Sequence, residues 1–240
     1  RQMCIRDRIK LEGGINMKTN KNYAFTLAEI LVTLGIIGVV AALTMPALIA
    51  NHKKQVVISR MQKFYTTINQ AVKFSEAENG DAADWQSAEY LDAESLYDFW
   101  NTYMAKYFVG KNIIKASDGI LIILSDGSGF GLYNPSIDSV NGIDWLHIVY
   151  CVDFKSCQNH LKKNNNKIYS YPLDGKNTFL FRGLKNSVIT YGSNIPRKRN
   201  VLINSIGSDN YGCADSYKAY CAALIEYDGW KINKDYPVHF

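Results

Sequence analysis

The chain has 240 residues, of which 47% are hydrophobic, 12% aromatic and 20% charged. This is the composition of a globular protein, and it excludes both a disordered chain and a multi-span membrane protein. The formal net charge is +5, but six basic and two acidic residues lie within residues 1–24. The remaining 21 basic and 20 acidic residues give a net charge of +1, which argues against nucleic acid as a partner.

Residues 1–24 are predicted to form a leader. Residues 1–16 have no hydrophobic periodicity and no capping signal, and residues 11–14 can be encoded by a purine-rich run like a bacterial ribosome-binding site. Met17 then opens a short basic segment that ends at Ala24. We therefore expect translation to start at Met17, so that residues 1–16 are not native protein.

An apolar segment follows from Phe25 to Ala50, with Glu29 as its one charged residue. As a helix, residues 30–50 would extend about 31 Å, close to the thickness of a hydrocarbon core. We therefore expect a membrane span at about residues 27–50. Lys18 and Lys21 before the span favour a cytoplasmic N-terminus. An uncleaved signal anchor is the simplest alternative.

Two residues distinguish this segment from a generic anchor. Glu29 is a carboxylate at the start of an apolar run, where charge is costly in lipid, so it suggests a specific partner. Pro46 removes a backbone hydrogen bond within the run and predicts a kinked or loosened helix.

Residues 24–29 (AFTLAE) resemble the processing signal of type IV prepilins and type II secretion pseudopilins. The resemblance implies that a prepilin peptidase cuts between Ala24 and Phe25 and that Phe25 becomes the methylated N-terminus. It also implies that Glu29 pairs with the N-terminal amine of a neighbouring subunit and that Pro46 is the family's helix-kinking proline. Ala24 departs from the family, which usually has Gly before the cut.

The resemblance also implies where the protein acts and with what. The expected partners are the prepilin peptidase, like subunits in a helical filament, an inner-membrane assembly platform and, before assembly, membrane lipid. The expected location is the bacterial inner membrane, crossed once with the N-terminus cytoplasmic, and then an extracytoplasmic filament or the cell surface. No cofactor is implied.

Beyond Ala50 the helical pattern continues to about residue 78. Its apolar residues recur at steps of three and four, which predicts a helix that packs one stripe on a globular head: Val57, Met61, Phe64, Ile68, Ala71 and Val72. Residues 79–81 (NGD) end the pattern, with Gly80 suited to a C-cap.

Residues 79–240 are predicted to form an extracytoplasmic globular head. A second helix is expected at residues 93–108, and a hairpin of strands 119–124 and 130–133 around a turn. Further strands are expected at 145–154, 178–181 and 187–190, a polar loop at 162–167, and a helix in the centre of 211–227. The fold class is therefore α+β: a long N-terminal helix, residues 25–78, on a small antiparallel sheet with short helices.

Four cysteines lie in the predicted head: Cys151, Cys157, Cys213 and Cys221. An even number beyond a membrane anchor fits disulfides in an oxidising compartment. Three connectivities are possible, and we favour the two local pairs, Cys151–Cys157 and Cys213–Cys221. Bonds between the two regions, a zinc site and free buried thiols are the alternatives.

No pattern of catalytic residues is present, so we expect no enzymatic activity. The four histidines match neither a nucleophile–base arrangement nor a metal-ligand spacing. Asp126 and Asp138 bracket a segment rich in small polar residues that could hold calcium, as in some pseudopilins. However, the EF-hand spacing is absent, and turn chemistry alone explains both aspartates.

Three functions therefore compete. The leading one is a structural subunit of a type IV pilus or a type II secretion pseudopilus. The second is a minor tip pilin whose head binds a substrate, a surface or DNA, and the third is an enzyme held by a signal anchor. Abundance in sheared filaments separates the first two, and an uncut chain in cells that carry prepilin peptidase would favour the third.

Overall fold

The computed structural model describes residues 26–109, 112–138, 141–169, 172–194 and 198–240. It divides the chain into two compact units, residues 1–46 and residues 47–240. The leader and the Ala24–Phe25 bond lie outside the described residues.

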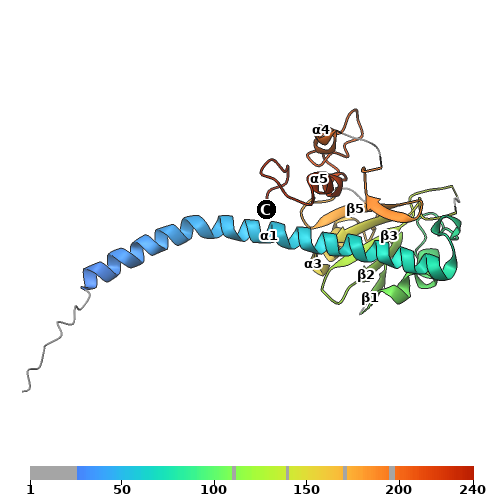
Figure 1. The fold of residues 1–240 in the computed structure, drawn as a ribbon, viewed down its shortest axis with the longest axis horizontal. Helices are drawn as coiled ribbons and strands as arrows, with labels where there is room; N and C mark the ends of the chain where they lie inside the picture. Colours follow the sequence, from blue (N-terminus) through green and yellow to red (C-terminus); the bar gives the residue numbers. More distant parts are fainter. Residues whose placement is uncertain (1–25, 110–111, 139–140, 170–171, 195–197) are drawn as a thin grey trace, which may run out of the picture. The chain divides into compact units, whose positions relative to one another are not determined.

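One helix, α1, runs from Leu27 to Asn79 and includes Pro46 (Figure 1). It ends where the sequence predicts, because Gly80 adopts a φ of +82°, a left-handed conformation that costs a residue with a Cβ far more than glycine. The Gly80 N–H still donates to the Glu76 carbonyl over 3.0 Å.

The unit formed by residues 47–240 contains one six-stranded antiparallel sheet in which the strands lie in chain order (Figure 1). This sheet and the long helix confirm the predicted α+β class. The strands are β1 (Asn112–Lys115), β2 (Gly119–Ile123), β3 (Gly129–Tyr133), β4 (His147–Cys151), β5 (Thr178–Leu184) and β6 (Ser187–Thr190). The predicted hairpin is β2–β3, and β1 was not predicted.

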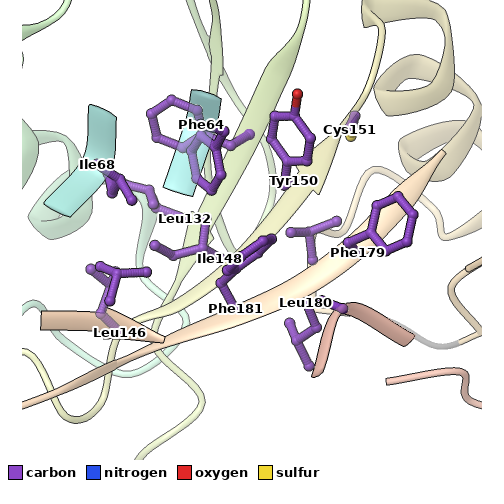
Figure 2. Close-up of a cluster of buried hydrophobic side chains, with 14 of the residues drawn as sticks. Phe64, Ile68, Leu132, Leu146, Ile148, Tyr150, Cys151, Phe179, Leu180 and Phe181 are labelled. Atoms are coloured by element: carbon purple, nitrogen blue, oxygen red, sulfur yellow. The ribbon is translucent and has the colours of Figure 1, made fainter. Parts of the chain in front are cut away.

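The second part of α1 packs on one face of the sheet. All six residues of the predicted apolar stripe are buried. Phe64 lies at the centre, with its ring 4.5 Å from that of Tyr150 on β4 and 5.3 Å from that of Phe181 on β5 (Figure 2). Burial of this apolar stripe against the sheet stabilises the second part of α1, because it removes apolar surface from water.

Asn69 adds a polar contact between α1 and the last strand. Its side-chain amide donates to the Val188 carbonyl over 2.9 Å and accepts from the Val188 N–H over 2.8 Å. The side chain thus makes both hydrogen bonds that a neighbouring strand would make with Val188.

The opposite face of the sheet is covered by α3 (Phe154–Lys163) and the loop after it. Gly131 on β3 makes room for that loop, since a Cβ there would lie 2.6 Å from Cγ2 of Ile168.

The predicted strand 145–154 is wrong at its end, because α3 begins at Phe154. Asp153 is instead the N-cap of α3, where its carboxylate accepts from the Ser156 N–H over 2.8 Å.

The helix expected at residues 93–108 is present but irregular. It consists of α2 (Ala93–Phe99), a π-helix (Trp100–Met104) and a 3-10 turn (Ala105–Tyr107), and a further 3-10 turn, η1 (Ala82–Asp84), precedes it. Trp100 packs against Phe130 at 5.6 Å between ring centroids, so its ring contributes to the core, as expected.

The last part of the chain is less helical than predicted. Among the described residues of this part, the helices are α4 (Arg199–Ile203), which was not predicted, and α5 (Cys221–Tyr227). The helix predicted within residues 211–227 is therefore present, but as α5 in the second half of that range and not at its centre. Residues 211–220 instead form turns whose backbone is held by Asp215, which accepts from the N–H groups of Ser205 and Gly212. Arg199 binds both Asp228 and Asp235 and so ties the C-terminal segment to α4.

Candidate functional site

The first part of α1 presents its apolar side chains outward. It is long and apolar enough to cross a membrane, and none of its most apolar stretch is buried within the chain. Leu27, Leu31, Ile37, Leu43 and Leu48 are all more than 60% exposed. A surface this apolar on a folded chain marks contact with lipid or with another protein.

Glu29 lies at the first turn of this helix and is bound by Thr26. Its carboxylate accepts from the Thr26 N–H and from the Thr26 hydroxyl, each over 2.8 Å, while the Glu29 N–H donates to the Thr26 hydroxyl over 3.2 Å. This is a capping box, which satisfies otherwise unpaired groups at the start of a helix. Sequence reasoning missed Thr26, although the Thr-x-x-Glu spacing is the signal for it.

The other polar side chains of the segment are also bound within the helix. The Thr33 hydroxyl donates to the Glu29 and Ile30 carbonyls and the Thr44 hydroxyl to the Val40 carbonyl, each over 2.9 Å. Since a polar group without a partner is costly in hydrocarbon, these bonds fit the segment to a lipid environment.

Pro46 lies within α1 and the helix continues on both sides of it. Because Pro46 has no N–H, the carbonyl four residues earlier lacks its usual helical partner. The same residue closes the first of the two compact units. The predicted kink stays a prediction.

The structure contains the two local disulfides among the alternatives that the sequence leaves open. Cys151 of β4 is joined to Cys157 of α3, with Cα atoms 5.5 Å apart, and Cys213 is joined to Cys221 of α5, with Cα atoms 4.6 Å apart. Both bonds fix a helix to a neighbouring segment of the head.

The two calcium candidates lie in different surroundings. Burial alone would raise the pKa of Asp126, but hydrogen bonds from Lys63 and Ser128 outweigh it and lower the pKa to about 2. Lys63 Nζ lies 2.6 Å from this carboxylate. Asp138 is exposed. Among the described residues no group of three metal-ligating side chains occurs, and the calcium assignment stays a prediction.

Two histidines of the head take part in packing contacts. His147 Nδ1 lies 3.3 Å from the Tyr133 hydroxyl, and burial, assisted by the charge of Arg182, lowers the pKa of His147 to about 3. His160 is buried, with Nε2 3.1 Å from the Ile168 carbonyl. The first contact joins β4 to β3, and the second joins α3 to the loop that follows it.

A comparison with protein families matches both parts of the chain. Residues 19–45 match the prokaryotic N-terminal methylation motif, which confirms the prepilin-type signal expected from residues 24–29. Residues 47–240 match a family of unknown function (DUF6613). No curated protein and no solved structure matches the chain.

The first match supports a pilin-like or pseudopilin-like structural subunit rather than an enzyme, and it implies processing by a prepilin peptidase and assembly with like subunits. It is also consistent with anchoring in a membrane, as is the exposed apolar helix. Because the second match covers most of the chain, the protein belongs to the family of unknown function DUF6613 and carries an N-terminal methylation motif of the type IV pilin and pseudopilin kind.

Proposed function

We propose that this protein is a structural subunit of a type IV pilus or a type II secretion pseudopilus. A prepilin peptidase cuts it between Ala24 and Phe25, and Phe25 is then methylated. The methylation motif at residues 19–45 carries this proposal, because it extends into the exposed apolar part of α1, residues 27–50, where Glu29 is the one charged residue.

The exposed apolar helix gives assembly its physical basis. One such helix cannot leave lipid alone, because its whole surface would meet water. In a bundle of copies each helix covers the next, so the apolar surface stays buried after the subunits leave the membrane. The head, with its two disulfides, then lies on the oxidising side of the inner membrane.

Glu29 sets the register between neighbouring helices. In the separate chain its carboxylate is bound by Thr26, which lowers the cost of keeping a charge at the membrane. In the filament the carboxylate gains the N-terminal amine of a neighbouring subunit as a partner. A buried charge that lacks such a partner is strongly unfavourable, so only the aligned arrangement is stable.

Mass spectrometry of the mature N-terminus tests the processing step. In cells that carry a prepilin peptidase, the mature chain should begin with methylated Phe25. A mature chain that begins at Met17 or after Ala42 would contradict the proposal.

Glu29→Leu tests the assembly step. The variant should still be cut after Ala24, but its incorporation into sheared filaments should fall at least tenfold, because the amine of the neighbour is left without a partner. Thr33→Leu is the matched control, since it removes a polar side chain one turn later and should assemble normally. Normal assembly of Glu29→Leu would refute the pairing.

A further inference from the structure

Charge is segregated by sign between residues 47 and 105. Between Ala47 and Ser75 the chain has five basic residues and no acidic one. Between Glu76 and Ala105 it has eight acidic residues and no basic one. The basic stretch lies on α1, whereas the acidic stretch begins at the end of α1 and continues through η1 and α2.

The acidic stretch folds against the C-terminal end of α1. The Trp85 indole donates to the Gly80 carbonyl over 3.0 Å and stacks on Tyr103 at 4.5 Å between ring centroids. Glu78 and Glu94 pair with lysines. No other ion pair among the described residues involves the remaining exposed carboxylates of this stretch, which we name the acidic end: Asp81, Asp84, Glu89 and Asp98.

The basic end consists of Lys53, Lys54 and Arg60. In the part of the chain that the structure describes, none of the three has a carboxylate partner, and Arg60 donates instead to the Val152 carbonyl over 2.7 Å. From Lys53 to Asn79 the helix rises about 39 Å, at about 1.5 Å per residue. Lys53 and Lys54 therefore cannot pair within one chain with Asp81, which follows the end of α1 directly.

We propose that the acidic end of one copy binds the basic end of a second copy. The partner is this chain itself, because each end carries the opposite charge that the other end lacks and has no ion-pair partner among the described residues. Contacts between two different surfaces of identical subunits repeat in one direction, and they build an open helical filament when the rotation between neighbours does not close into a ring. The inference rests on the proposed function, since it supplies a contact between heads in the same assembly.

Complementary charge chiefly affects the orientation and the rate of such a contact. Single exposed ion pairs contribute little, and salt screens them beyond about 8 Å at physiological ionic strength. The contact therefore depends on several pairs acting together. Tyr90, which is 48% exposed beside Glu89, offers apolar surface within the acidic end.

Charge reversal in the full-length chain tests the proposal, with expression alongside a prepilin peptidase and an assembly platform. Glu89→Lys with Asp98→Lys, and separately Lys53→Glu with Lys54→Glu, should each lower the yield of sheared filaments about tenfold. The four substitutions together restore opposite charges and should bring the yield to within about threefold of the wild type. Lys162→Glu with Lys163→Glu, on the exposed side of α3, is the matched control and should assemble normally.

Cross-linking reads out the same contact without substitutions. Treatment of wild-type filaments with a zero-length carbodiimide should join Lys53 or Lys54 to Asp81 or Asp84, which one copy cannot do over the length of α1 that separates them. Wild-type yields for both reversed pairs, or a fourfold variant no better than either pair, would overturn the inference. The proposed function would survive that failure of the charge-reversal variants if the wild type assembles and Glu29→Leu does not. A wild type that is neither cut nor assembled refutes the proposed function instead.

Discussion

The two parts of α1 have the same secondary structure but opposite surroundings. In residues 27–46 apolar side chains point outward on all sides, and each polar one is bound by the helix itself. In residues 47–79 one stripe is buried against the sheet, while polar side chains such as Asn69 reach across to it. The apolar surface of the first part must be covered by lipid or by another protein, whereas the apolar stripe of the second part is covered by the sheet of the same chain.

This difference separates two kinds of sequence information. The composition of the first part indicates its environment, since an all-round apolar helix must be surrounded by apolar material. The periodicity of the second part indicates its partner, because a stripe at steps of three and four needs a single apolar face. Substitutions in the two parts should therefore affect different measurements.

The largest expected effect on stability is that of Phe64→Ala. Phe64 is 2% exposed and contacts three aromatic rings, so its loss leaves a cavity and should cost about 3–5 kcal/mol. For a head of this size the melting temperature should fall by about 10 °C in detergent-solubilised full-length protein. Leu34→Ala, at a position that is 59% exposed, should leave it unchanged. Equal effects of the two variants would show that the two parts of α1 do not differ in their contribution to the stability of the head.

A smaller effect is expected from Asn69→Ala. Removal of the amide leaves the N–H and the carbonyl of Val188 without their partner, which should lower the free energy of unfolding by about 1–3 kcal/mol. Gln70→Ala, one position along on an exposed site, should change it little. Denaturant unfolding of both variants measures the difference. If Asn69→Ala is no less stable than Gln70→Ala, the polar contact does not stabilise this half of the helix.

The smallest effect concerns the ion pair between Lys63 on α1 and Asp126. The pKa of Asp126 is lowered from its ordinary value near 3.8 to about 2, so its contribution is present above about pH 4 and is lost as the pH falls toward 2. Because Lys63 is largely exposed, solvent screening limits the contribution to less than about 1 kcal/mol. Asp126→Asn should be slightly less stable than the wild type at pH 7, and the difference should shrink as the pH falls through about 2. A difference that is as large at pH 2 as at pH 7 would mean that the charge is not its source.

Much of the fold could be predicted because its signals are local. The stripe of α1, the stop at Gly80 and the β2–β3 hairpin each depend on residues close in sequence. The end of β4 could not be placed, because the apolar run continues to Phe154 while Asp153 caps a helix that packs on the far face of the sheet. The turns at residues 211–220 depend on Asp215, a contact that spacing does not reveal.

The candidate site divides in the same way. Residues 24–29 form a linear signal, so the motif could be recognised without any structure. The acidic end, by contrast, could not be predicted. Its position depends on how η1 and α2 pack back against the end of α1, and no local sequence pattern indicates that packing.

Asn69 has a consequence for how copies of this protein can be crowded together. Val188 lies on β6, the last strand of the sheet, and the edge of a sheet is a template on which another chain can add a strand. The Asn69 amide occupies both backbone groups of Val188, so a strand from a neighbour would first have to displace α1. At the opposite edge, Lys115 of β1 is paired with Glu94 and places charge where a strand would dock. Both edges of the sheet are thereby protected against the addition of a strand from a neighbouring copy.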